Sequence, residues 1–145
     1  MQKNTNPFLF FLFLLAFIFP LSGVFTLVGA AQEGMTRSHS GGGVRIEVTW
    51  LDSSALAKGE AISFEVRMNT HTVDLDEYDL LKLAFLRNDK GKVFKPKAWE
   101  SPQDGGHHRS GVLVFPKGDP GSRSLELIIM DVAGIKERAF RWEVK

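Results

Sequence analysis

Alternation of apolar and polar residues is the feature that most restricts the fold of this chain. In the stretch VRIEVTW, residues 44–50, every second side chain is apolar and the side chains between them are polar. The stretch AISFEVRMN, residues 61–69, repeats this pattern. Successive side chains of a β-strand point to opposite faces of its sheet, so a period of two predicts strands that are buried on one side.

Five further segments carry strand signals, and no segment shows a convincing helical period. Turn sequences such as NDKG, KGDPGS and VAGI separate them. Pro96 and its neighbouring lysines suit one of these segments to a sheet edge. Seven short strands predict an all-β fold, an immunoglobulin-like antiparallel β-sandwich, with a small closed barrel as the alternative. The five additional strands are predicted at 80–89, 92–99, 111–116, 124–131 and 136–144.

The N-terminus has the order of a targeting segment. Lys3 precedes a long apolar run that breaks at Pro20 and ends in small residues at Ala31. This order is typical of a secretory signal peptide cut after Ala31. The uncharged residues 7–31 are also long enough to span a bilayer as an uncleaved anchor. We therefore expect residues 1–31 to be a signal peptide or membrane anchor of an exported protein, periplasmic or extracellular, with membrane contact only through residues 7–31 if they are retained.

The rest of the chain divides into a short linker and one domain. Residues 32–43, QEGMTRSHSGGG, are polar and glycine-rich, which predicts a flexible linker before a β-sandwich domain at 44–145. Without Lys3 the chain keeps 17 of its 18 basic residues against 17 acidic ones. Basic and acidic residues are interspersed, and the sequence contains no basic patch of the kind that nucleic-acid-binding proteins carry. The absence of cysteine excludes disulfides and thiolate metal sites.

Two connections are longer than turns, at 70–79 and 100–111. If every connection reverses the chain between the two ends of the sandwich, both loops lie at the same end. The second loop contains the segment GGHHRSG, residues 105–111, in which glycines flank two histidines and an arginine. This end would gather five candidate metal ligands, which are His71, His107, His108, Asp74 and Asp76.

Neutral imidazoles and carboxylates are suitable ligands for copper(II), nickel and zinc. The candidate set therefore predicts a non-catalytic protein that carries or buffers a divalent transition metal, copper(II) first. Arg109 opposes a metal unless an acid neutralises it, and it could instead join an acid of the 70–79 loop. The alternative is a structural or protein-interaction module of the cell envelope, whose histidines bond to backbone carbonyls and whose loops contact a partner protein. We expect no enzyme activity, because no nucleophile elbow or oxyanion loop accompanies Ser110.

The segments NTHTVDLDEYDL and WESPQDGGHHRSGVLVFP resemble an uncharacterised family of exported prokaryotic proteins with NTH…DL and GGHHR…G segments. The resemblance covers residues 68–116 and implies export and a β-rich domain, without a settled activity. More distantly, the chain resembles small periplasmic copper carriers, which are cysteine-free β-sandwiches with His, Met and Asp ligands at one end. Those carriers use a histidine at the mature N-terminus, whereas this chain would begin at Gln32 and has no histidine before His39. Copper carriage is therefore implied by fold and ligand type only.

Overall fold

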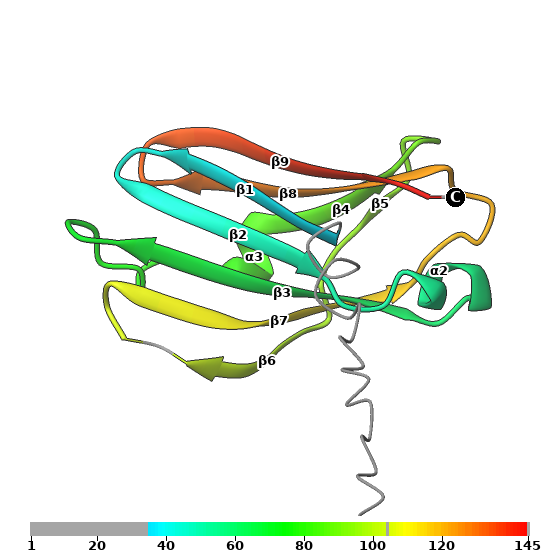
Figure 1. Ribbon diagram of the computed structural model, residues 1–145, viewed down its shortest axis with the longest axis horizontal. Helices are drawn as coiled ribbons and strands as arrows, with labels where there is room; N and C mark the ends of the chain where they lie inside the picture. Colours follow the sequence, from blue (N-terminus) through cyan, green and yellow to red (C-terminus); the bar gives the residue numbers. More distant parts are fainter. Residues whose placement is uncertain (1–34, 104, 145) are drawn as a thin grey trace, which may run out of the picture.

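The computed structural model describes residues 35–103 and 105–144, which form two β-sheets packed face to face (Figure 1). The all-β sandwich predicted from the alternating pattern is confirmed. Residues 1–31, predicted to be a signal peptide or anchor, lie outside the described residues. Within the two described ranges, no helix combines the length and the apolar character needed to cross a membrane.

The described residues form nine strands and two short helices, and all strand pairs are antiparallel. The five-stranded sheet has the order β1–β2–β3–β7–β6, and the four-stranded sheet has the order β5–β4–β8–β9. The bounds are β1 Thr36–Gly41, β2 Val44–Trp50, α2 Ser54–Lys58, β3 Ala61–Thr70, α3 Leu80–Leu83, β4 Ala84–Asn88, β5 Val93–Phe94, β6 Ala98–Gln103, β7 His108–Lys117, β8 Ser124–Val132 and β9 Ile135–Glu143.

Strand β1 corrects the predicted linker. Thr36–Gly41 pairs with β2 along its whole length, from Thr36 opposite Thr49 to Gly41 opposite Val44. The glycines that suggested flexibility form the hairpin turn, where Gly42 and Gly43 have φ values of 61° and 76°. A two-residue hairpin turn favours positive φ at both positions, which glycine adopts without steric cost. The polar composition misled the prediction because none of the six strand residues belongs to the buried core.

Two other predicted strands differ in detail. The segment 80–89 begins with helix α3, because the Asp79 carboxylate accepts a hydrogen bond from the Leu81 N–H at 3.1 Å and caps the helix. The segment 92–99 is divided between the two sheets, since β5 pairs with β4 and β6 pairs with β7. Pro96 lies between β5 and β6, where its missing N–H removes no ladder hydrogen bond.

Four aromatic rings pack between the two sheets toward the end where β2, β7 and β9 finish. The centroid of Phe64 in β3 lies 5.0 Å from that of Trp142 in β9 and 5.9 Å from that of Phe115 in β7. Trp50 lies 6.3 Å from Trp142 in an edge-to-face arrangement. All four rings are almost completely buried. Aromatic pairs in this geometry bury large apolar areas, so the cluster helps to hold the two sheets together.

One end of the sandwich, at the left of Figure 1, holds the connections β1–β2, β3–α3, β6–β7 and β8–β9. Hydrogen bonds join them, since the Thr70 hydroxyl donates to the Gly43 carbonyl at 2.8 Å and the Ala133 N–H donates to the Tyr78 hydroxyl at 3.1 Å. We call this the histidine end. The predicted meeting of the two long loops is confirmed, and the β1–β2 turn joins them there.

Candidate functional site at the histidine end

Backbone hydrogen bonds join the GGHHRSG segment to the 70–79 loop. The Thr70 N–H donates to the His107 carbonyl at 3.0 Å, and the Leu75 N–H donates to the Gly106 carbonyl at 2.8 Å. Leu75 is fully buried, although most of the loop around it is exposed. The segment therefore acts first as a clamp that fixes the position of the long loop.

The Arg109 side chain strengthens this clamp. Its guanidinium donates to the Leu75 carbonyl at 3.0 Å and to the Tyr78 carbonyl, and it lies 5.7 Å from the centroid of the Trp99 ring. Arg109 thus joins the two loops through backbone carbonyls of the 70–79 loop. Hydrogen bonds from a charged donor are stronger than neutral ones, so this contact is central to the loop's conformation.

The two adjacent histidines make different contacts. His107 Nδ1 lies 3.1 Å from the Val73 carbonyl oxygen, whereas His108 Nδ1 lies 2.8 Å from Asn69 Oδ1. Because both partners are oxygens that only accept, we assign the proton of each ring to Nδ1. In a neutral ring this leaves Nε2 with its lone pair available to a metal or a donor. The clamp therefore also fixes the tautomers of both imidazoles.

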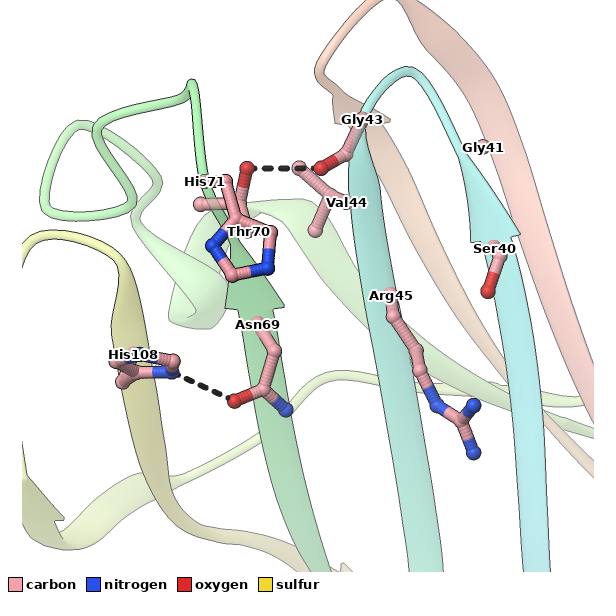
Figure 2. Close-up of a pocket in the computed structure, with 9 residues that line it drawn as sticks. All are labelled: Ser40, Gly41, Gly43, Val44, Arg45, Asn69, Thr70, His71 and His108. Carbon is pink, nitrogen blue, oxygen red and sulfur yellow. Dashed lines mark hydrogen bonds between the residues drawn. The ribbon is translucent and has the colours of Figure 1, made fainter.

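His71 and His108 line the same open groove, which has a volume of about 380 Å³ (Figure 2). Its floor follows one row across the outer face of the sheet, because Arg45, Asn69 and His108 are opposite one another on β2, β3 and β7. In the view of Figure 2 the His71 ring lies above Asn69, and His108 lies to the left of Asn69, joined to it by a hydrogen bond. Both histidines are exposed to solvent.

The predicted aspartate ligands lie outside this groove. Asp74 Oδ1 accepts a hydrogen bond from the Asp76 N–H at 3.0 Å, which forms a local turn. Neither carboxylate lines the cavity, and His107 is absent from its lining as well. Across residues 35–103 and 105–144, no group of three or more His, Asp or Glu side chains could hold a metal ion. The structure thus brings together two of the five predicted ligands, His71 and His108.

The charge in the groove is balanced. The Arg45 guanidinium forms an ion pair with Glu47 at 2.6 Å, and Figure 2 shows it directed away from His71. This pair is exposed, so its main effect is to offset the positive charge beside the groove rather than to add stability. A cation bound near His71 would therefore meet little repulsion from Arg45.

Asn69 is the site residue that the sequence did not indicate. It occupies a polar position of β3 like its neighbours Glu65 and Arg67, and its residue type carries no chemical signal. Its role depends on the register that places it opposite His108. Only knowledge of the strand pairing could have identified it.

Replacing Arg109 with alanine is expected to release the 70–79 loop. The loss of two charge-assisted hydrogen bonds should lower the free energy of unfolding by about 1–3 kcal/mol. Hydrogen exchange measured by mass spectrometry should become faster at Leu75 and Tyr78. The control is Arg67→Ala, which removes an exposed ion pair with Glu65. Unchanged exchange in the Arg109 variant would show that this side chain does not hold the loop.

The histidine end offers two imidazole rings in one groove, with the tautomer of His108 fixed by Asn69. Such rings can donate lone pairs to a transition metal or accept hydrogen bonds from a partner. No protein-family model, curated protein or solved structure matches this chain.

Proposed function

We propose that this is an exported, non-catalytic β-sandwich protein that binds a transition-metal ion, copper(II) first, through Nε2 of His71 and His108. The observation that carries the proposal is that both rings line one groove while Asn69 Oδ1 accepts the Nδ1 proton of His108. Metal-ligating histidines typically donate their second nitrogen to an oxygen in this way, which fixes the tautomer and the ring orientation.

The freedom of His71 supports the same assignment. Among the described residues, no hydrogen bond is formed by its ring, so rotation about the side chain is free to bring Nε2 toward the metal. Copper(II) accepts nitrogen and oxygen ligands in tetragonal geometry, so water or a donor from a partner would complete the coordination. A site with two protein ligands and open positions suits carriage or buffering, because the metal can leave it readily.

Calorimetric titration of the purified protein with copper(II) at pH 7.5 tests this proposal. His71→Ala and His108→Ala should each weaken binding by about tenfold or more, the scale of effects seen at metal sites. His107→Ala is the matched control, because that ring bonds to Val73 outside the groove. Equal affinity in all three variants would contradict the proposal.

A second candidate function is an interaction module of the cell envelope. The clamp favours it, because His107 and Arg109 hold the 70–79 loop through backbone carbonyls and leave a pre-formed surface. Ordered loops lose less entropy on binding a partner. A photo-crosslinker at Asp76 should then capture the same envelope protein with and without copper, and Arg109→Ala should reduce the yield. Crosslinking that depends on copper and on His71 would favour the metal function.

A further inference from the structure

The end opposite the histidines forms a continuous surface, which we call the α2 end. It comprises helix α2 and the turns 89–92 and 118–123 (Figure 1). Lys90 Nζ lies 2.9 Å from an Asp119 carboxylate oxygen, which joins the two turns. The chain enters here, because the Met35 carbonyl accepts a hydrogen bond from Trp142 Nε1 at 2.7 Å. The described chain therefore begins on the β1–β9 side of this end.

Two large apolar side chains are exposed at the α2 end, Leu51 beside β2 and Val93 on β5, the edge strand opposite β9 in its sheet. Leu51, directly after β2, is 47 % exposed, and Val93 in β5 is 52 % exposed. The third large exposed hydrophobic residue of the described chain is Leu81, at 40 %, which lies near the other end in α3. Single exposed apolar residues are common on protein surfaces. Leu51 and Val93 therefore indicate a binding surface only together with the charges and the cavity at the same end.

The two ends differ in charge. The 70–79 loop at the histidine end carries four acidic residues and no basic one. At the α2 end, exposed Lys58, Lys92 and Lys117 form no ion pair within the described residues. Exposed Asp52 and Glu60 beside helix α2 offset part of this positive charge. An anionic surface would therefore attract the α2 end weakly and repel the acidic loop, which favours one orientation of the domain.

A cavity of about 680 Å³ opens at the α2 end between β1 and β9. Arg37 and Arg141 line it together with Trp50, and Glu143 offsets one of the two positive charges through its ion pair with Arg141. The Arg37 guanidinium is held in place by the Arg141 carbonyl at 3.0 Å. Trp50 is only 2 % exposed, and its indole N–H has no acceptor among residues 35–103 and 105–144. Two guanidinium groups and an unused donor suit an anionic oxygen ligand such as a phosphate.

The sequence limits how far this end can lie from a bilayer. Only residues 32–34 separate the apolar segment 7–31 from Met35. Even fully extended, such a link spans about 14 Å, at roughly 3.5 Å for each step. With the apolar segment retained in a membrane, the α2 end is thus the part of the domain nearest the lipid headgroups.

We propose that the α2 end is the surface that the domain presents to an anionic phospholipid bilayer. Leu51 and Val93 meet the headgroup region, and the cavity of Arg37 and Arg141 receives a lipid phosphate. The proposal goes beyond metal binding and does not depend on it. It orients the histidine groove away from the membrane, where metal or partners have free access.

Fluorescence quenching in vesicles tests this orientation. The natural chain has no cysteine, so Leu51→Cys, Val93→Cys and Leu81→Cys each provide one labelling site. The full chain is reconstituted in vesicles of phosphatidylglycerol and phosphatidylcholine that contain a headgroup-nitroxide lipid. Labels at positions 51 and 93 should be quenched about threefold more than the label at 81, which is the matched control. Equal quenching at the three positions, or failure of the chain to associate with vesicles, would overturn the proposal.

A charge-neutralised chain tests the lipid chemistry. The triple variant Lys92→Gln/Lys117→Gln/Arg141→Gln, labelled at position 51, should lose at least about half of the quenching in phosphatidylglycerol vesicles. Circular dichroism checks that it is folded. In vesicles of phosphatidylcholine alone, the parent chain should already show the lower value. If quenching at position 51 changes neither with the substitutions nor with the lipid charge, an anionic headgroup is not the ligand.

Discussion

Replacing Arg138 with alanine lowers the free energy of unfolding by about 3–5 kcal/mol, one of the two largest losses expected in this chain. Arg138 in β9 is completely buried. Its guanidinium donates to the Val132 carbonyl and to the Gly41 carbonyl, both at 2.7 Å. These bonds join the β8–β9 turn to the end of β1. Alanine would leave two carbonyls without their donor and a cavity where the side chain lay.

The size of this loss in stability depends on which residue replaces Arg138. Burial lowers the pKa of Arg138, and the nearby Tyr78 hydroxyl opposes that shift. Arg138 Nε has no acceptor, and no ion pair to Arg138 is found among the described residues. Arg138→Met should therefore cost less than Arg138→Ala, because it fills the space and removes a charge that is poorly solvated. In the parent protein, the charge of Arg138 strengthens its hydrogen bonds to the two carbonyl oxygens.

Urea unfolding of the two Arg138 variants, followed by fluorescence, measures these differences. Lys136→Ala on the same strand is the control, since Lys136 is exposed and should change the free energy by less than about 0.5 kcal/mol. An Arg138→Ala loss no greater than that of Lys136→Ala would show that the two carbonyl contacts contribute nothing to stability.

Gly42→Ala is the second substitution with a large expected effect, a loss of about 2–4 kcal/mol. Gly42 has a φ of +61°, and an added Cβ would collide with the Ala133 carbonyl oxygen. Because that atom belongs to the backbone, the β8–β9 turn must move away from the β1–β2 turn. The movement would also disturb the Arg138 contact to Gly41.

Gly134→Ala separates the clash from the backbone strain. Gly134 has a similar φ of +74°, but an added Cβ would meet no atom within 4 Å. This control should lose only the strain of a left-handed residue, about 1–2 kcal/mol. Thermal and urea unfolding of both variants give the comparison. Equal losses in the free energy of unfolding at the two positions would mean that the close approach of the two turns does not affect stability.

The alternating stretches at 44–50 and 61–69 predicted strands with one buried face, and the five further segments between turn sequences extended this to a sandwich. The chain reversal between successive strands likewise predicted that the two long loops meet. Strand β1 was missed because polar residues at a sheet edge need no core contact. Glycine content also cannot distinguish a tight hairpin turn from a flexible linker.

The candidate site was predictable only in part. Residue type identified the histidines, since few side chains can bind a transition metal. It could not separate His108 from His107, because the direction of each ring depends on backbone details at the start of β7. Asp74 and Asp76 were included for their chemistry, but they form a local turn. Asn69 became visible only through the cross-strand register.

The central claim is that His71 and His108 share one metal ion, and electron spin-echo envelope modulation of bound copper(II) tests it most directly. The remote nitrogen of each coordinated imidazole produces a characteristic modulation, so the spectrum counts the rings. Two imidazoles are expected in the parent protein and in His107→Ala, and one in His71→Ala or His108→Ala. A count that falls in the His107 variant, or stays unchanged in the other two, would contradict the groove as the metal site.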